Sequence, residues 1–321
     1  MANSIEGSKF FITGGAGFIG SNISELLVGK GANTAVYDNL SSGSYSFIEG
    51  LVGKGLKFTK GDVLDREFLA SAMKAESPDA VVHFAANPNA KLGKGQDLIN
   101  EGIVSTYNVL EACRHANVKN IIFSSSGSIY GIAKVKPTPE EYGPLKPISM
   151  YGAMKLASEG LISAFSSMYG INFYIFRFAN VVGRNATHGV VFDLINKLRK
   201  NGSELQVLGD GTQRKSYVSV DDCVSAVLYV YAKSGDRENI FNIASDDQIS
   251  VSEIADIVVD KAAKGAMKVF GTTKGGWPGD ITDNFISNKK LKDFGYVPRF
   301  NSRSAIETTA DYVLSGKAKP A

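Results

Sequence analysis

The stretch FFITGGAGFIGSN, residues 10–22, decides the fold of this 321-residue chain. It begins as an apolar strand, passes through a glycine turn and continues with the pattern of a helix. Glycines at this spacing let the turn adopt positive φ, let backbone approach a pyrophosphate and let helix pack on strand. The N-terminus of the helix adds N–H groups and a partial positive charge. We therefore predict a dinucleotide phosphate site here, with contacts from Gly14, Gly17, Phe18, Ile19 and Gly20.

Strand-like and helix-like segments alternate through the first half of the chain. The strand candidates are 9–13, 33–38, 56–61, 80–86, 120–126 and 172–178, and helical patterns occupy 18–30 and 104–117. This alternation predicts a parallel sheet covered by helices on both faces. The expected fold class is α/β, a Rossmann-like doubly wound parallel sheet.

The alternation of strand-like and helix-like segments becomes irregular after about residue 180, where loops separate shorter elements. Helical patterns remain at 220–233, 250–263 and 302–316. We predict a dinucleotide-binding domain over 1–180 and a smaller, interleaved C-terminal domain that is mainly formed by 181–321 and binds the substrate. The chain is expected to cross back to the first domain near 217–245.

The composition argues against a nucleic-acid-binding protein and against a membrane protein. The chain is 44% hydrophobic and 21% charged, with a net charge of +3, and it has no basic block that would suit nucleic acid or a membrane surface. No window is apolar enough for a membrane span. The two cysteines, Cys113 and Cys223, lie in helical contexts and are read as reduced core thiols. These features predict a cytoplasmic protein without a metal site.

Asp38 ends the second predicted strand, about 20 residues beyond the glycine turn, where a carboxylate can bind the adenosine ribose hydroxyls. Its charge would repel a 2′-phosphate, and Asn39 follows where an NADP enzyme would favour arginine. We therefore predict NAD as the cofactor.

Two further strand ends face the same predicted edge. Asp62 either bonds the adenine amino group or caps the helix that starts at Asp65, and the sequence leaves both open. Ala85 and Ala86 are small and leave room for a cofactor beside the sheet. His83, within an apolar strand, is interpreted as a core histidine.

The stretch ISMYGAMKLASE, residues 148–159, places Tyr151 four residues before Lys155. This spacing puts both side chains on one helix face. The ammonium and a positive nicotinamide are expected to lower the tyrosine pKa, which suits a base that deprotonates an alcohol. The strand ending in FSSSGSIYG, residues 123–131, can bring a serine hydroxyl to the same place.

At this point the chain resembles the extended short-chain dehydrogenase/reductase family. The resemblance is carried by TGGAGFIG (13–20), SSSGSIYG (124–131) and the pair in YGAMK (151–155). It implies catalytic roles for Ser126, Tyr151 and Lys155, with Ser125 less suited than Ser126, and a second role for Lys155 in holding the nicotinamide ribose. From YDNLSSG (37–43), HFAANP (83–88) and nearby segments it implies further cofactor contacts by Ser41, Ser42, Gly43, Val63, Phe84 and Ser124.

Within this family the chain is most similar to the UDP-galactose (UDP-glucose) 4-epimerases. The segments concerned are RFANVVG (177–183), HGVVFDLI (188–195), LGDGTQRKSYVSVDD (208–222) and WPGD (277–280). The resemblance implies a UDP-hexose substrate that is oxidised at C4, turned in its pocket and reduced on the other face. The substrate contacts it implies are Ser126, Tyr151, Asn180, Val190, Val207, Arg214, Lys215 and Asp280.

Some positions depart from that group. Lys215 and Trp277 stand where arginines are usual, and Gly102 stands where an asparagine is usual. The acid pair of the related 4,6-dehydratases is replaced by Gly127 and Ser128, so that chemistry lacks its acid and base.

Three alternatives remain open: an epimerase or decarboxylase for UDP-glucuronate, an enzyme for UDP-N-acetylhexosamines, and a non-catalytic dinucleotide sensor. Asn284 stands where some relatives have a tyrosine gate, and its smaller side chain would leave room for N-acetyl sugars.

The resemblance also implies a homodimer that packs two helices of each subunit into a four-helix bundle. The helices concerned are near 103–116 and 152–168. The second carries apolar residues beyond one stripe, which favours a second buried face. They are Met154, Leu156, Leu161, Ile162, Phe165 and Met168.

Overall fold

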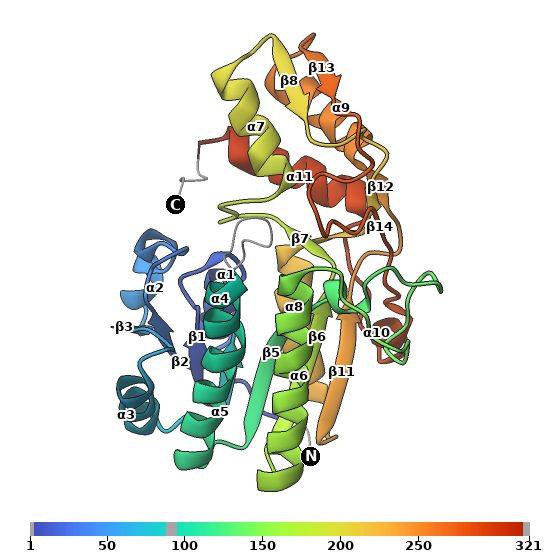
Figure 1. Ribbon diagram of the computed structural model, residues 1–321. Coiled ribbons are helices and arrows are strands. Elements are labelled where there is room, and N and C mark those ends of the chain that lie inside the picture. Colours follow the sequence, from blue (N-terminus) through green and yellow to red (C-terminus); the bar gives the residue numbers. More distant parts are fainter. Residues whose placement is uncertain (1–2, 88–94, 317–321) are drawn as a thin grey trace.

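The computed structural model describes residues 3–87 and 95–316. At its centre is a parallel sheet of seven strands, shown in Figure 1. In spatial order the strands are β11 (Glu238–Ile243), β6 (Asn172–Phe178), β5 (Asn120–Ser126), β4 (Ala80–His83), β1 (Lys9–Thr13), β2 (Asn33–Asp38) and β3 (Lys57–Lys60). The prediction of a Rossmann-like doubly wound sheet is confirmed, with the order reversing between β1 and β4.

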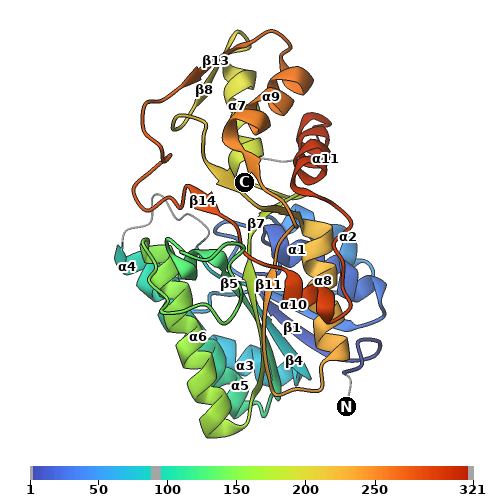
Figure 2. The same cartoon turned by 90° about the vertical axis from the view of Figure 1, so that its right-hand side faces the viewer.

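Helices cover both faces of this sheet, because its central strands are buried on both sides. One face packs on α3 (Arg66–Glu76), α5 (Ser105–His115) and α6 (Met150–Tyr169), and the other on α1 (Phe18–Gly29) and α8 (Val220–Lys233). Figures 1 and 2 show the two helical layers on either side of the strands. Because all seven strands are parallel, their carboxyl ends lie at the same edge of the sheet, where the predicted cofactor-binding and catalytic residues also lie.

The chain returns to this sheet after its first half. β7 (Asn180–Val182) pairs with β10 (Tyr217–Ser219), α8 follows directly, and β11 adds a strand beside β6. The residues of α8 and β11 belong to the same hydrophobic core as those of β1.

A second hydrophobic core lies beyond the carboxyl edge of the sheet (Figure 2). It is built by α7 (Val190–Lys200), α9 (Val251–Ala262) and α11 (Ser302–Leu314), together with β8 (Glu204–Val207). β8 pairs in parallel with β13 (Met267–Phe270). A small sheet next to it has the order β12 (Ile249–Ser250), β9 (Arg214–Lys215) and β14 (Asp283–Asn284).

Short elements complete the described chain. They are η1 (Tyr45–Phe47), α2 (Glu49–Val52), α4 (Gly95–Leu98), a π-helical turn η2 (Ile99–Val104), η3 (Gly127–Tyr130) and α10 (Lys289–Asp293). Within the described ranges no helix combines the length and the apolar character needed to cross a bilayer.

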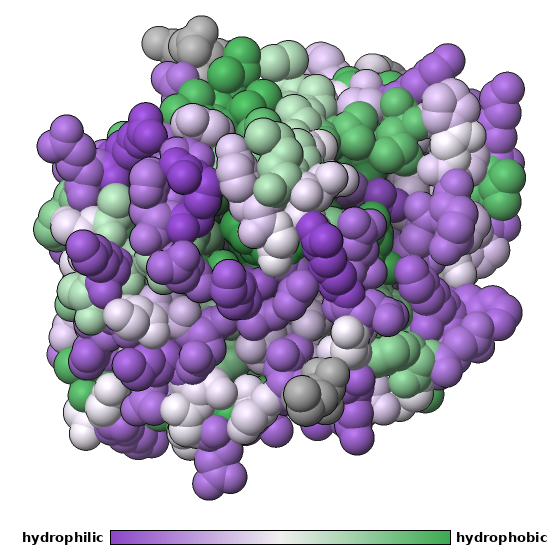
Figure 3. Space-filling view, turned by 90° about the horizontal axis from the view of Figure 1, so that it is seen from below, coloured by the Kyte–Doolittle hydropathy of each residue, from purple (hydrophilic) through white to green (hydrophobic). Residues whose placement is uncertain are grey.

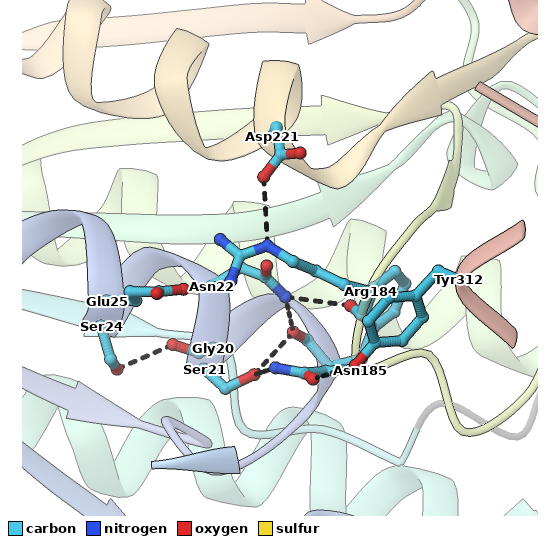
Figure 4. A network of polar contacts seen from close by, with 10 residues as sticks. Gly20, Ser21, Asn22, Ser24, Glu25, Arg184, Asn185, Asp221 and Tyr312 are labelled. Carbon is cyan, nitrogen blue, oxygen red and sulfur yellow. Dashed lines mark hydrogen bonds and ion pairs between the residues drawn. The ribbon is translucent and has the colours of Figure 1, made fainter. Parts of the chain in front are cut away.

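Polar contacts tie the turn after β7 to α1 and α11, as Figure 4 shows. Asn185 donates to Ser21 Oγ (3.0 Å) and accepts from the hydroxyl of Tyr312 (3.0 Å). Arg184 forms ion pairs with Glu25 on α1 and with Asp221 at the start of α8. The helix that follows the glycine turn is thereby linked directly to the second core.

Candidate active site

The glycine turn is as tight as the sequence predicts. Gly14 has φ +74°, and a Cβ at this position would lie 2.5 Å from the backbone nitrogen of Ala85. A Cβ at Gly20 would lie 1.9 Å from the carbonyl oxygen of Gly14. α1 begins at Phe18 without a side-chain cap, so no cap side chain bonds its first N–H groups, which are the groups that a helix N-terminus offers to an anion.

Asp38 is at the end of β2, next to this turn. Its carboxylate accepts from the backbone N–H of Ala16 (2.9 Å) and of Leu40 (2.8 Å), and burial raises its pKa. A Cβ at Gly43 would lie 2.5 Å from the carbonyl oxygen of Ala16, which brings the loop containing Ser41 and Ser42 against the glycine turn.

Asp62 and Asn39 lie together beyond Asp38. Asn39 donates to Asp62 (2.9 Å) and accepts from the backbone of Ser41 (2.9 Å). Asp62 does not cap the following helix, because Asp65 is the N-cap of α3 and accepts from Phe68. Val63, between the two aspartates, accepts through its carbonyl from Asn108 (3.0 Å).

β4 ends at His83, whose ring bonds to Thr13 (2.8 Å) and Thr106 (3.2 Å). Burial lowers the pKa of His83 to about 3, so it stays neutral in the core. Phe84, Ala85 and Ala86 follow it at the carboxyl edge; Pro88, the end of the HFAANP match, lies outside the described residues.

Ser126, Tyr151 and Lys155 come together at this edge from β5 and the first turns of α6. Ser149 caps α6 by accepting from Gly152 (3.1 Å), which fixes where the helix starts. Ser126 lies close enough to the Tyr151 hydroxyl to lower the pKa of that group, although burial outweighs this effect. Lys155 Nζ donates to the carbonyl of Ser124 (2.6 Å).

The expectation of a lowered tyrosine pKa is wrong for the ligand-free protein. Burial raises the pKa of Tyr151 to about 12, against a smaller opposite effect of Ser126. Burial also lowers the pKa of Lys155 to about 7, against the charge of Glu159, which raises it. Spacing alone predicted the partners but not the desolvation, which acts against both charged forms.

Gly102, in place of the usual asparagine, has a packing explanation. A Cβ at Gly102 would lie 2.0 Å from the sulfur of Met154. Met154 is itself buried on α6, one residue before Lys155, so its side chain occupies the volume that a larger residue 102 would need.

On the opposite side of the edge, Lys215 and Asp280 form an ion pair of 2.5 Å in which both side chains are mostly buried. The ammonium of Lys215 also lies 5.8 Å from the centre of the Trp277 ring. Asp280 accepts in addition from the backbone of Gly276 (3.0 Å). The structure thus brings both departures, Lys215 and Trp277, into one cluster.

Arg214 is not part of that cluster. Consecutive side chains of a strand point to opposite sides, and Arg214 precedes Lys215 on β9. Its side chain is 54% exposed, 3.8 Å from Glu253, and it bonds the carbonyl of Gln248 (3.4 Å).

The remaining substrate candidates lie on separate elements. Asn180 begins β7 and donates to the carbonyl of Ser216 (3.2 Å). Val190 is the first residue of α7, after Gly189 with φ +104°. Val207 ends β8 and is buried. Asn284 pairs with Lys215 between β14 and β9.

Glu159 and Arg177 were not predicted from the sequence as part of the site. They form a buried ion pair of 2.8 Å, and Glu159 lies one helical turn beyond Lys155 on α6. The available signal was the spacing of Glu159, which follows Lys155 by four residues and so shares its helix face.

These residues define a class of protein. A tight glycine turn at the start of a helix, a carboxylate beside it and a Ser–Tyr–Lys group at the same sheet edge are typical of a dinucleotide-dependent enzyme of the doubly wound α/β fold. A family model described as the NAD dependent epimerase/dehydratase family matches residues 10–244. The chain belongs to this family, and its cofactor is NAD.

Individual relatives agree with this. The chain is 28% identical over 310 residues to a putative UDP-glucose 4-epimerase of Methanocaldococcus jannaschii, covering 94% of this chain and 97% of the relative. A crystal structure of a UDP-galactose 4-epimerase is 35% identical with TM-score 0.86, covering 96% of this chain and 99% of that one. The Thermus thermophilus UDP-glucose 4-epimerase in complex with NAD is 30% identical with TM-score 0.85, covering 95% and 98%.

Proposed function

We propose that the protein interconverts UDP-glucose and UDP-galactose by inverting C4 through a 4-keto intermediate. The observation that carries this proposal is the grouping of Ser126, Tyr151 and Lys155 at the end of β5, where Lys155 Nζ donates to the carbonyl of Ser124 and lies 5.9 Å from the centre of the Tyr151 ring. Gly127 and Ser128 follow the serine, so the acid and base needed to remove water from the sugar are missing at those positions.

The residues present fit NAD. The glycine turn has no room for side chains, the N-terminus of α1 has no side-chain cap, and Asp38 lies beside the turn. When bound, NAD accepts the hydride from C4 of the sugar and returns it later in the cycle.

In this mechanism Tyr151 removes the proton from the 4-hydroxyl group, and Ser126 shares the same sugar oxygen. Burial raises the pKa of Tyr151 to about 12 in the ligand-free protein, so the phenolate needs positive charge nearby. Lys155, on the same helix face, supplies that charge when it is protonated. Tyr151 then gives the proton back when the keto group is reduced on its opposite face.

Lys215, Asp280 and Asn180 are proposed to hold the nucleotide while the sugar turns. Lys215 offers an ammonium to the diphosphate, and Asp280 offers a carboxylate to the ribose. Their mutual ion pair places both groups in the substrate-free protein, so the substrate meets a site that is already assembled. Arg214 has no role in this proposal, since its side chain lies on the other side of β9.

The test is NMR of UDP-glucose, UDP-galactose, their N-acetyl forms and UDP-glucuronate, each incubated with the protein. Equilibration of UDP-glucose with UDP-galactose, without net change in NAD, is the expected result. If UDP-galactose stays unchanged while another sugar nucleotide is converted, the named substrate is wrong.

A second candidate is epimerisation of UDP-glucuronate, and one observation favours it. The hydroxyl of Ser128 is buried and has no hydrogen-bond partner among the described residues, two positions beyond Ser126. A donor at this place fits a sugar with an additional acceptor such as a carboxylate. The same NMR series separates the two candidates.

Asp38→Ala should narrow the preference for NAD over NADP. The carboxylate of Asp38 repels a 2′-phosphate, and alanine removes that charge without filling the site. Calorimetric titration with both cofactors measures the two affinities. Equal affinities already in the unaltered protein would contradict the role of Asp38.

We also propose a homodimer through α5 and α6, in a protein of the cytoplasm. Three of the six apolar residues on α6, Met154, Ile162 and Phe165, are buried within the subunit. The exposed apolar surface is instead provided by Val104, Tyr107, Met168 and Tyr169. Figure 3 shows apolar side chains gathered along its upper edge, the side of the molecule on which these helices lie.

Gly160→Arg should convert this dimer to a monomer. Gly160 is exposed on α6, and a Cβ at this position would have no neighbouring atom within 4 Å, so arginine is tolerated in the subunit but places a charge in the interface. Gly29→Arg, at the end of α1 and equally open, is the matched control. Light scattering measures both, and a Gly160→Arg dimer would rule out this face.

A further inference from the structure

A buried network of charges lies directly behind Lys155. Glu159, one helical turn further along α6, is 7% exposed, and Arg177 on β6 is 5% exposed. Arg177 donates twice to the carboxylate, from Nε at 3.1 Å and from a terminal nitrogen at 2.8 Å. The hydroxyl of Ser125 donates to the same carboxylate at 2.5 Å.

The same strand holds both Lys155 and Glu159. Lys155 Nζ donates to the carbonyl of Ser124 (2.6 Å), and the next residue, Ser125, donates to Glu159. Two consecutive residues of β5 therefore fix two side chains that are one turn apart on α6. This arrangement keeps the carboxylate on the helix face that also carries the ammonium and Tyr151.

Arg177 is held on its other side as well. It donates to the hydroxyl of Tyr130 (3.0 Å) and to the carbonyl of Glu140 (2.7 Å). These bonds fix the guanidinium, and with it the position of the Glu159 carboxylate.

We propose that Glu159, held by Arg177 and Ser125, is a positioning residue that keeps Lys155 protonated, so that Tyr151 rather than Lys155 releases the proton. This inference rests on the Tyr151–Lys155 pair of the proposed function. The pair can hold one shared proton on the Lys155 amine or on the Tyr151 phenol, and Glu159 favours the first of these two states.

The electrostatics around Lys155 support this. Burial lowers the pKa of Lys155 to about 7, and the charge of Glu159 opposes that effect. The other titratable groups facing Lys155 are Tyr151 on α6 and His83 on β4, and His83 is neutral because burial lowers its pKa to about 3. The charge of Arg177 on β6 is paired with the Glu159 carboxylate.

Glu159→Gln tests the proposal, because it keeps the shape and the acceptor oxygen but removes the charge. Without that charge Lys155 loses its proton more readily, and fewer molecules hold the phenolate of Tyr151 at neutral pH. We expect turnover at neutral pH to fall about tenfold or more, the effect of one pKa unit on such a population. Glu159→Asp, which restores the charge, should recover part of the loss.

The titration of Tyr151 distinguishes this electrostatic role from a purely structural one. If Glu159 only stabilised the fold, removing its charge would leave the titration of Tyr151 unchanged. The tyrosinate absorbance of the NAD-loaded protein is followed against pH, and the curve of a Tyr151→Phe partner variant is subtracted. The phenolate signal at neutral pH should fall in Glu159→Gln by about the same factor as turnover. An unchanged signal in a folded Glu159→Gln protein overturns the proposal.

Two further variants complete the experiment. Glu140→Gln is the matched control, since Glu140 is a buried carboxylate in the same network that accepts from the backbone of Asn242 (2.8 Å), and its signal should match that of the unaltered protein. A signal that falls equally in Glu140→Gln would overturn the specific role of Glu159.

If Glu159→Gln does not fold, the double variant Glu159→Met with Arg177→Met replaces the whole ion pair by apolar side chains, a change that buried pairs often tolerate. It should show the same loss of phenolate, and a normal signal would overturn the proposal.

The tyrosinate titration needs NAD but no sugar nucleotide. It therefore remains decisive if the NMR series shows that UDP-glucose is not the substrate.

Discussion

Tyr151→Phe is expected to lower turnover about 10²–10⁴-fold, the usual contribution of a general base. Phenylalanine keeps the ring at the start of α6 and removes only the hydroxyl. Binding of NAD should survive, because the glycine turn, Asp38 and Lys155 are unchanged. Turnover of the sugar nucleotide identified by NMR and calorimetry with NAD measure the two effects separately.

Tyr174→Phe is the matched control for this variant. Tyr174 is also a buried tyrosine with a bonded hydroxyl, which accepts from Asn3 (2.7 Å), but it lies on β6 away from the carboxyl edge. It should retain near-normal turnover. A Tyr151→Phe protein that binds NAD and turns over at the rate of this control would show that another group is the base.

The first half of the fold was predictable because its signals are local. Most strands from β1 to β6 are short and largely apolar, with β3 (KFTK) as an exception. The glycine turn lies between a strand and a helix that are adjacent in sequence. The residues of the proposed catalytic centre are also close in sequence: Ser126 ends a strand, and Tyr151 and Lys155 are four residues apart on the helix that follows. Parallel topology then brings these ends to one edge without further information.

What the sequence could not show depends on contacts between distant residues. Met154 fills the space beside Gly102, 52 residues earlier in the chain, and no local pattern reveals that pairing. Arg214 and Lys215 are equivalent in a basic loop, but a strand of two residues turns only one of them toward Asp280. The pKa of Tyr151 was predicted in the wrong direction because burial, unlike spacing, is a property of the folded chain.

Asp222 is another such residue. In the sequence it is one of two adjacent aspartates, but in the structure the two side chains differ in their exposure to solvent. Asp222 is fully buried, whereas the Asp221 side chain is 46% exposed. The buried carboxylate accepts from the backbone nitrogens of Arg299 and Phe300 (3.0 Å each) and from Arg299 Nε (3.1 Å).

These bonds fasten the segment that leads into α11 to α8, which packs on the main sheet. Asp222→Ala leaves the backbone N–H groups of Arg299 and Phe300 without their acceptor in a part-buried place. The guanidinium of Arg299 also loses its partner, but this side chain is 65% exposed and water can replace the carboxylate. We expect the free energy of unfolding to fall by about 1–3 kcal/mol, the usual cost of leaving a buried polar group without its hydrogen-bond partner. Urea denaturation followed by circular dichroism measures the change.

Asp221→Ala provides the comparison within the same turn of helix. Asp221 pairs with Arg184 at 3.3 Å on a partly exposed surface, where an ion pair contributes about 0–1 kcal/mol. Both variants replace aspartate by alanine in the first turn of α8. The change in helix propensity is therefore nearly the same in both and cancels when their unfolding free energies are compared. The difference in unfolding free energy therefore measures what burial and the bonds to residues 299 and 300 contribute. If both variants unfold at the same urea concentration, the carboxylate of Asp222 does not hold the second core to the sheet, and the polar contacts of Arg184 and Asn185 with α1 and α11 must do so instead.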